Sequence, residues 1–391
     1  MSYDSGWGNV IENNVLGDKT MPGIKNQTQF WPSYLILELT TRCNLRCLMC
    51  AINQDPRIQK GGEWYGDLSL DAFDNLSKVM SKIKRIDLNG HGESLLSPHF
   101  LPVLEKVKQH GAYVGITTNA LLMGKEIVES IVRNKMDEII VSIHAATAES
   151  YASISRGGKL DELIANLKAL NAFKEKYNTM LPAVRFNFVG MKGNIGELKG
   201  LIRLAVDLKV ETITVLPLAE YDSVSGEALQ SSDLAAYIPN ALKTADECGV
   251  KLYVPKIYLD QIGLVQQHEP GGEKKRSPLR NKIKSIFKGL LPKPKPHDGD
   301  TELIRDCTDP WDFFFVMQSG RIRPCCVIEE NMGNLSKQQF EEIWFGEKYH
   351  KLRNDILNNT PPPQCKTCIN RPFTTLAELR AKVQGKVSPA T

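Results

Sequence analysis

The run Tyr34-Leu-Ile-Leu-Glu-Leu-Thr-Thr-Arg-Cys-Asn-Leu-Arg-Cys-Leu-Met-Cys50 carries the strongest signal in this chain. Its apolar start, residues 34–39, predicts a strand, and Cys43, Cys47 and Cys50 follow in the next loop. Three thiolates from one loop can bind three irons of a cubane iron–sulfur cluster, whose fourth iron then lacks a protein ligand. Zinc sites instead pair their ligands as Cys-x2-Cys with a second pair nearby. The incomplete ligand set therefore favours a reactive cluster over a zinc knuckle or buried cysteines.

Length and composition are those of an ordinary globular protein. The chain has 391 residues, 42% of them hydrophobic, which is enough for a sizeable core in two or three domains. It starts without an export signal, and no stretch approaches the ~18 apolar residues of a membrane span, so we expect a cytoplasmic protein. No nucleic-acid partner is expected. Nine cysteines, mostly near two places, favour metal binding over disulfides, and isolated Cys248 is predicted to be buried.

Predicted strands alternate with predicted helices along much of the chain. Parallel neighbours need helical crossovers of one hand, so six such units predict an α/β fold with the sheet curled into a partial barrel. Barrels of this kind carry function at the carboxyl ends of their strands. The predicted strands are residues 34–39, 85–89, 113–117, 138–143, 184–189 and 212–216, and the helices are 70–82, 100–110, 125–134, 160–176 and 195–208.

Polar motifs follow three of these strands. After the second strand comes Asn89-Gly-His-Gly-Glu93, in which glycines let the backbone approach a ligand and the carboxylate of Glu93 can bind an ammonium group. Thr117-Thr-Asn-Ala120 follows the third strand, and Val141-Ser-Ile-His-Ala-Ala146 ends the fourth, with Arg156 shortly after. A guanidinium suits bidentate binding of a carboxylate. A Gly-x-Gly-Glu motif alone is often only a turn. Its position after a predicted strand makes a ligand-binding role for residues 90–93 more plausible.

Together these motifs resemble the radical S-adenosylmethionine (SAM) enzymes, whose signature is Cys-x3-Cys-x2-Cys after the first barrel strand. The resemblance implies a partial (β/α)6 barrel, a [4Fe–4S] cluster on Cys43, Cys47 and Cys50, and SAM bound to the open iron. It also implies reductive cleavage of SAM to a 5′-deoxyadenosyl radical that takes a hydrogen atom from the substrate, with a flavodoxin- or ferredoxin-type reductant. Met49 stands where the family usually has an aromatic residue, and its thioether can still cover an adenine ring. The residues that the resemblance assigns to SAM binding are Met49, Gly92, Glu93, Asn119, Ser142 and Arg156.

Two histidines at the predicted mouth of the barrel have two interpretations each. His144 stands where the family usually has aspartate and could contact substrate or move a proton, since its ordinary pKa of about 6.5 allows both charge states near neutrality. A hydrogen-bonded structural role is the preferred interpretation for His144 and for His91. After the fifth strand, Asn194 is a predicted helix N-cap with Glu197 at the third helical position.

The C-terminal third holds a second group of cysteines. Residues 313–322 read as a β-hairpin and two helices follow, a pattern that resembles the small twitch or short SPASM-like extension of certain radical SAM enzymes, an α+β domain. The resemblance implies an auxiliary [4Fe–4S] cluster, with Cys326 the less favoured residue of an adjacent cysteine pair. A zinc site is the alternative, and five cysteines instead of seven argue against a second auxiliary cluster. The implied ligands are Cys307, Cys325, Cys365 and Cys368.

Residues 274–295 form a basic segment with nine Lys and Arg residues and no acidic residue. Their apolar residues fall at helical spacing, which gives a short amphipathic segment. It could rest on an anionic membrane surface or bind an anionic substrate such as a phosphorylated or lipid-linked sugar. The preferred interpretation is a solvated, poorly ordered insertion, because prolines flank it.

We expect five segments: an N-terminal extension (1–33), the barrel (34–220), a helical and basic linker (221–300), the auxiliary-cluster domain (301–372) and a tail (373–391). The preferred function is that of a radical SAM oxidoreductase that oxidises the substrate radical through the auxiliary cluster. A sugar-like alcohol is the favoured substrate, because the cysteine spacing resembles twitch-type dehydrogenases. The alternative is a SPASM-type maturase that crosslinks, epimerises or oxidises a peptide or protein. An iron–sulfur electron carrier or scaffold is the alternative of another class, and the predicted SAM pocket argues against it.

Overall fold

The computed structural model describes residues 30–219, 222–264, 303–368 and 371–387. The basic segment 274–295 and the predictions made for it lie outside the described residues. No helix within the described ranges is long and apolar enough to cross a membrane.

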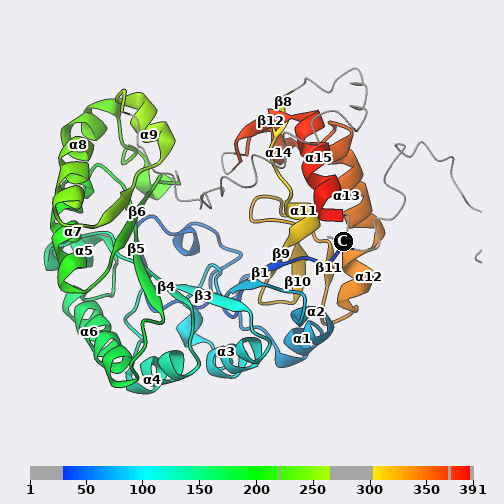
Figure 1. Ribbon diagram of the computed structural model, residues 1–391, viewed down its shortest axis with the longest axis horizontal. Coiled ribbons are helices and arrows are strands. Elements are labelled where there is room, and N and C mark those ends of the chain that lie inside the picture. Colours follow the sequence, from blue (N-terminus) through cyan, green and yellow to red (C-terminus); the bar gives the residue numbers. More distant parts are fainter. Residues whose placement is uncertain (1–29, 220–221, 265–302, 369–370, 388–391) are drawn as a thin grey trace, which may run out of the picture.

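Seven parallel strands, in the order of the chain, form the barrel sheet (Figure 1). The six predicted strands are all present, and the predicted α/β fold is confirmed. A seventh strand, β7 (Lys251–Tyr253), pairs with β6 in the region where the sequence predicts a linker. The other strands are β1 (Tyr34–Leu37), β2 (Arg85–Asp87), β3 (Tyr113–Thr118), β4 (Glu138–Ser142), β5 (Ala183–Val189) and β6 (Thr212–Leu216).

The connecting helices cover the outer face of this sheet (Figure 1). The predicted helix 70–82 is interrupted, because Asn75 ends the first part and donates its side-chain amide to the carbonyl of Leu335. Cys248 follows the last residue of α8 and is exposed, so its predicted burial is wrong: the helix ends there at the protein surface. The helices are α1 (Leu70–Asp74), α2 (Ser77–Met80), α3 (Phe100–Gln109), α4 (Lys125–Arg133), α5 (Ala148–Ile154), α6 (Leu160–Lys176), α7 (Leu198–Asp207), α8 (Ser231–Glu247) and α9 (Lys256–Gln261).

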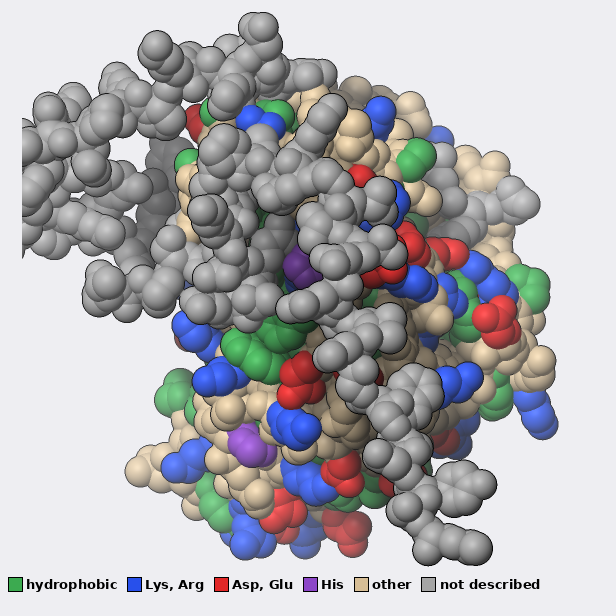
Figure 2. Space-filling view, turned by 90° about the vertical axis from the view of Figure 1, so that its right-hand side faces the viewer, with side chains coloured by type: hydrophobic (Ala, Val, Ile, Leu, Met, Phe, Trp, Pro, Cys, Tyr) green, Lys and Arg blue, Asp and Glu red, His purple; other side chains and the backbone are tan. Residues whose placement is uncertain are grey.

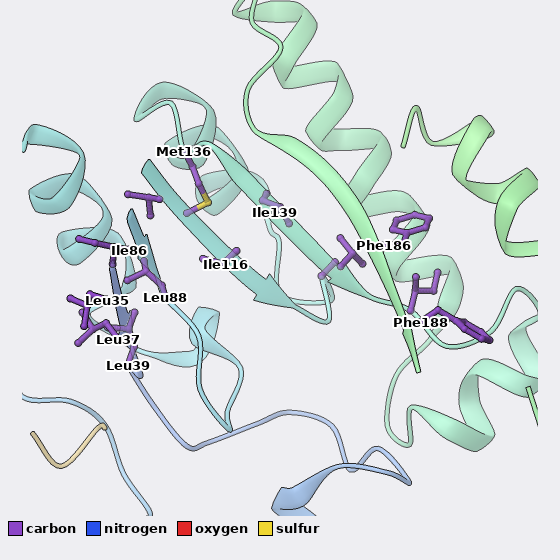
Figure 3. Packing of buried hydrophobic residues seen from close by; sticks show 14 of the residues in the cluster. Leu35, Leu37, Leu39, Ile86, Leu88, Ile116, Met136, Ile139, Phe186 and Phe188 are labelled. Carbon is purple, nitrogen blue, oxygen red and sulfur yellow. The ribbon is translucent and has the colours of Figure 1, made fainter. Parts of the chain in front are cut away.

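The core lies between the sheet and its outer helices (Figure 3). Leu35 and Leu37 of β1, Ile116 of β3, and Phe186 and Phe188 of β5 are completely buried. Buried and half-buried residues alternate along β1 and β6 and along the end of β5, so one face of these strands packs against the helices. The sequence located these strands as short segments rich in apolar, β-branched and aromatic residues.

The C-terminal region joins the barrel at its first strand. The predicted hairpin is present, and its strand β9 (Phe313–Val316) pairs in parallel with β1 over its whole length. Strands β10 (Arg321–Arg323) and β11 (Gly333–Asn334) continue the same sheet, so the hairpin extends the barrel and has no separate sheet of its own. The remaining elements are β8 (Leu303–Arg305), α11 (Asp309–Asp312), α12 (Phe340–Trp344), α13 (Glu347–Leu357), α14 (Pro363–Lys366), β12 (Phe373–Thr375) and α15 (Leu376–Val387).

A buried arginine holds the helices of this region together. The guanidinium carbon of Arg353 lies 4.6 Å from the ring centroid of Trp344 and 4.8 Å from those of Phe30 and Tyr349. The guanidinium donates to the carbonyl oxygens of Pro310 (2.8 Å) and Trp344 (2.9 Å). Burial lowers the pKa of Arg353 to about 10, which leaves the side chain charged at neutral pH. Aromatic faces and carbonyls therefore replace the water that this cation has lost.

Candidate functional site

The three-cysteine loop follows β1 at the carboxyl end of the barrel strands. Two backbone hydrogen bonds fix this loop to the end of α5 and the turn that follows it: the N–H of Leu48 donates to the carbonyl of Ile154, and that of Arg46 to the carbonyl of Arg156, both at 2.9 Å. All three thiols in the loop are partly buried. The loop is therefore held by its backbone, which leaves its sulfurs available for a ligand.

These three thiols share one neighbourhood. The charges of Cys43 and Cys50 both act on Cys47, and burial raises the pKa of Cys43 to about 11 and that of Cys47 to about 12. Burial also raises the pKa of Cys50. Such thiols stay protonated at neutral pH unless a metal ion takes the place of the proton. Three soft donors on one loop fit a [4Fe–4S] cluster with one open iron.

The loop after β2 packs directly against the cysteine loop. A Cβ on Gly92 would lie 2.5 Å from the carbonyl oxygens of both Arg42 and Thr40. The N–H of Glu93 donates to the carbonyl of Arg42 at 2.8 Å. Glycine permits this close approach of two backbones. Gly92 thereby places Glu93 beside the cysteine loop.

The carboxylate of Glu93 is buried, with 3% of the residue exposed. Its Oε1 accepts from the hydroxyl of Thr118 (2.8 Å) and the N–H of Leu95 (3.3 Å), and its Oε2 accepts from the N–H of Asn119 (2.8 Å). Burial raises the pKa of Glu93, and no Lys or Arg among the described residues forms an ion pair with it. A buried carboxylate without a cation fits the ammonium group of an amino-acid ligand.

The other residues predicted to bind SAM lie around the same loop. Asn119 donates its side-chain amide to Oδ1 of Asn44 in the cysteine loop at 2.9 Å. Met49 is buried, Ser142 ends β4 and is half-buried, and the side chain of Arg156 is exposed. The fold thus gathers these residues at one end of the barrel, and their contacts with SAM stay predictions.

His144 is buried and hydrogen bonded at the end of β4. Its Nδ1 accepts from the N–H of Val189 at 3.2 Å, and burial lowers the pKa of His144 to about 4. Asn194 occupies the predicted N-cap position but makes no capping bond with its side chain, because this side chain donates to the carbonyl of His144 (3.0 Å) and accepts from Met191 (2.7 Å). These bonds support the structural interpretation of His144.

The auxiliary hairpin places its two adjacent cysteines differently. Cys325 follows β10, and its sulfur accepts the N–H groups of Val327 (3.4 Å) and Ile328 (3.3 Å). Cys326 is exposed. Hydrogen bonds to sulfur favour the thiolate and tune iron–sulfur clusters. These hydrogen bonds support the predicted choice of Cys325, and its role as a ligand stays a prediction.

The C-terminal thiols lie close enough to influence one another. The pKa of Cys365, which burial raises to about 11, also responds to the charges of Cys325 and Cys368, and burial raises the pKa of Cys307. Within the described ranges, no three His, Cys, Asp or Glu side chains lie at the spacing of ligands to a single metal ion. The proposal that these cysteines bind an iron–sulfur cluster therefore depends on the proximity of their sulfur atoms, which are soft donors.

Both cysteine groups touch one apolar cluster. Strand β9 pairs with β1, which the cysteine loop follows, and with β10, which leads to Cys325. Cysteines from both groups, Cys43, Cys50 and Cys325, pack against this cluster. The residues of the cluster are Ile52, Ile58, Trp64, Phe313, Phe315 and Met317.

Glu38, which the sequence motifs did not single out, lies where the barrel meets the auxiliary hairpin. Its buried Oε1 accepts the backbone N–H of His91 (2.7 Å) and lies 2.7 Å from His91 Nδ1, and its Oε2 accepts the N–H of Gln318 (3.3 Å). A Cβ on Gly90 would lie 2.3 Å from Cγ of Glu38. The sequence did contain a signal for Glu38, since this charged residue stands between two leucines, Leu37 and Leu39, that are buried. A carboxylate in such a position needs hydrogen-bond or charged partners.

Comparison with known proteins agrees with this geometry. A family model described as the radical SAM superfamily matches residues 37–205, and one described as an iron–sulfur cluster-binding domain, SPASM, matches residues 307–369. A Pyrococcus furiosus protein named "tungsten-containing aldehyde ferredoxin oxidoreductase cofactor-modifying protein" is 32% identical over 340 residues, 86% of either chain. The chain belongs to the radical SAM superfamily.

Two solved structures share the fold of this radical SAM chain. SuiB of Streptococcus suis, bound to the precursor peptide SuiA, has a TM-score of 0.56 at 15% identity over 82% of this chain. The match spans only 66% of SuiB. The structure of anSMEcpe with bound AdoMet has a TM-score of 0.53 at 15% identity and covers 86% of this chain and 87% of that one. These likenesses show the fold alone.

Membership in the radical SAM superfamily confirms the predicted cofactors. They are a SAM-binding [4Fe–4S] cluster, SAM itself and auxiliary iron–sulfur binding in the C-terminal domain. The matched SPASM domain favours an iron–sulfur cluster over the zinc alternative. The assignment of single ligands and SAM contacts stays a prediction.

Gly92→Ala should lower the free energy of unfolding by about 1–3 kcal/mol and weaken SAM binding, because the added methyl group would push the Glu93 loop away from the cysteine loop. Gly124→Ala is the matched control, since a Cβ there meets nothing within 4 Å and the φ of Gly124 is −64°. Thermal unfolding and the SAM dependence of 5′-deoxyadenosine formation measure the effect. Equal behaviour of the two variants would contradict this prediction.

His144→Asn should remove one component of acid sensitivity. Because the pKa of His144 in the folded chain, about 4, lies below the ordinary value, the unfolded chain binds the proton more readily. The natural protein should therefore lose up to about 3 kcal/mol through this group as the pH falls from about 6.5 to 4. The amide oxygen of asparagine can still accept the Val189 N–H but does not titrate. Urea unfolding of both proteins across this pH range tests the difference, and parallel curves would contradict it.

Proposed function

We propose that this chain is a radical SAM oxidoreductase that oxidises its substrate by two electrons, with an auxiliary [4Fe–4S] cluster as the acceptor of the second. One observation carries the proposal. Strand β9 pairs with β1, whose following loop carries Cys43, and with β10, which leads to Cys325, and both cysteines pack on the same apolar cluster. A substrate beside this cluster would therefore lie near cysteines of both groups.

The residues of the barrel bind and orient SAM. Cys43, Cys47 and Cys50 hold a cluster that, when bound, supplies an open iron for SAM and the electron for its cleavage to methionine and a 5′-deoxyadenosyl radical. Glu93 receives the ammonium group of SAM, since a buried carboxylate gains its missing cation there. The guanidinium of Arg156 binds the carboxylate of SAM.

The substrate lies between the barrel and the auxiliary hairpin. Cys307, Cys325, Cys365 and Cys368 hold the auxiliary cluster, which when bound accepts one electron. Because Nδ1 of His144 accepts a hydrogen bond from the backbone, Nε2 carries the ring proton of the neutral imidazole. A neutral imidazole with a pKa of about 4 does not change charge near pH 7. We therefore give His144 a structural role, in which it joins the end of β4 to β5 and to Asn194.

A small organic substrate is favoured over a peptide. The similarity to a protein whose name denotes cofactor modification extends over 86% of both chains, whereas the likeness to a peptide-bound structure is one of fold at 15% identity. Our first candidate substrate is a sugar-like alcohol, and the second is the organic cofactor of another enzyme. The third candidate is a peptide or protein, in which case the chain would be a maturase.

An anaerobic assay with reductant, SAM and deuterated candidate substrates tests the proposal. Deuterium in 5′-deoxyadenosine from a sugar-like alcohol, with a ketone as product, would support it. Deuterium from the cofactor would support the second candidate, and deuterium from a peptide the third. A protein that never cleaves SAM under reducing conditions would instead be an iron–sulfur carrier or scaffold.

A further inference from the structure

Cys47 lies opposite a buried serine. The two residues that flank Cys47 donate backbone hydrogen bonds to the carbonyls of the two residues that flank Ser155, both at 2.9 Å. This pairing brings Cys47 and Ser155 side by side, and only 2% of Ser155 is exposed. Burial raises the pKa of Cys47, and a hydrogen bond from the Ser155 hydroxyl acts in the opposite direction. The Ser155 hydroxyl is therefore a donor to the Cys47 sulfur.

A tyrosine stands one helical turn before this serine. The N–H of Ser155 donates to the carbonyl of Tyr151 at 2.7 Å at the end of α5, so both side chains lie on the same face of the helix. Tyr151 is completely buried, and its hydroxyl lacks a hydrogen bond of regular geometry within the described residues. A Cβ on Gly158 would lie 3.1 Å from Cε1 of Tyr151, so the glycine leaves room for the ring. Buried polar groups normally have a partner, and this hydroxyl is available for one.

Both Cys47 and Ser155 lie near the tyrosine hydroxyl. Burial raises the pKa of Tyr151, the charge of Cys47 raises it further, and the Ser155 hydroxyl lowers it. Tyr151 therefore keeps its proton at neutral pH and can donate a hydrogen bond. The Ser155 oxygen can accept this bond while the serine proton goes to the Cys47 sulfur. Hydrogen bonds joined in this way polarise and strengthen one another.

The other two thiols of the loop have backbone donors. The N–H of Leu45 donates to the sulfur of Cys43 at 3.4 Å. Burial raises the pKa of Cys50, and the N–H of Ile52 lowers it. Charges at the surface have a weaker influence, because Lys and Arg are interspersed with Asp and Glu on the face shown in Figure 2 and salt screens them. The buried hydroxyl beside Cys47 is therefore the adjustable donor, since a side chain can change whereas a backbone N–H stays.

We infer that the hydroxyls of Tyr151 and Ser155 form a chain of hydrogen bonds to the Cys47 sulfur that raises the reduction potential of the SAM-binding cluster. The inference rests on the proposed function in one respect, namely that Cys47 binds this cluster. Reduction adds one electron, and a donor stabilises the more negative sulfur of the reduced state more strongly than that of the oxidised state. Tyr151 and Ser155 act through Cys47, so both are positioning residues.

The test measures this reduction potential in the reconstituted holoenzyme by a titration followed with electron paramagnetic resonance. The SAM-binding cluster is recognised as the one whose signal changes when SAM is added. Ser155→Ala should lower the ratio of reduced to oxidised cluster at a fixed potential by about tenfold, which is ~59 mV for one electron. Tyr151→Phe should act in the same direction by about twofold, because it removes only the outer donor. Ser155→Thr keeps a hydroxyl and should retain the natural potential.

Ser153→Ala and Tyr177→Phe are the matched controls. Ser153 is exposed on the same helix, and its hydroxyl donates to the carbonyl of Ser150 at 2.9 Å. Tyr177 is exposed, and its hydroxyl donates to Glu129. Each control loses the same hydroxyl as its counterpart, and both should keep the natural potential.

Iron and sulfide content shows whether each variant keeps its clusters. An unchanged potential in Ser155→Ala with full cluster content overturns the inference alone. A potential in Ser155→Thr as low as that of Ser155→Ala does the same, because packing and not the hydroxyl would then set the value. If Ser155→Ala loses the cluster, Tyr151→Phe decides, and an unchanged potential in that variant overturns the inference. A natural protein that holds no reducible cluster overturns the proposed function and this inference with it.

Discussion

A Cys47→Ala variant is expected to cleave SAM at least about a thousandfold more slowly than the natural protein, a loss of ~4 kcal/mol of transition-state stabilisation. Cys47 lies between the other two thiols of the loop in sequence, and the charges of both act on it. With two thiols left, the loop cannot hold three irons of a cubane, and SAM loses the iron to which it would bind. Iron and sulfide content, the electron paramagnetic resonance signal of the reduced protein and 5′-deoxyadenosine yield measure the effect.

The chain supplies its own control for this prediction. Cys248 is exposed at the end of α8 and belongs to neither cysteine group, so Cys248→Ala should keep the iron content and full SAM cleavage. The same chemical change then has opposite outcomes at two positions. A Cys47→Ala protein that still forms 5′-deoxyadenosine at the rate of the Cys248→Ala protein would remove the basis of the proposed function.

The double variant Cys365→Ala/Cys368→Ala should separate the two halves of the reaction. SAM cleavage should stay within about threefold, because the cysteine loop after β1 is untouched, whereas formation of oxidised product should fall by about a hundredfold or more. Without a neighbouring electron acceptor, the substrate radical has no route to the oxidised state. The measured quantity is the ratio of product to 5′-deoxyadenosine, which should drop sharply.

Cys326→Ala is the matched control for the auxiliary site. Cys326 adjoins Cys325 but is exposed, whereas Cys325 accepts two backbone N–H groups through its sulfur. We expect Cys326→Ala to keep the auxiliary cluster and Cys325→Ala to lose it. If Cys326→Ala lost the auxiliary cluster and Cys325→Ala kept it, Cys326 would be the ligand in place of Cys325. Full product formation by the Cys365→Ala/Cys368→Ala variant would show that the oxidation does not need this cluster.

The sequence was informative wherever a local pattern has a single physical meaning. Strands such as β3 and β5 were located because short segments rich in β-branched and aromatic residues are typical of strands. The loop 43–50 was recognised because ligand spacing within one loop is a property of the chain itself. Predictions were weaker at Asn75 and Asn194, where tertiary partners decide where a helix breaks and what a side chain bonds.

Motifs and spacing in the chain were thus sufficient to predict the superfamily and the barrel, whereas the single cysteine ligands stay predictions. The position of the auxiliary hairpin was not foreseeable, because β9 pairs with β1 and Gln318 binds Glu38 across 280 residues of chain. The stacking of Arg305 on Phe373 likewise exists only once β8 and β12 pair. Local patterns report the burial and conformation of a segment, whereas the choice of its distant neighbours depends on the packing of the whole chain.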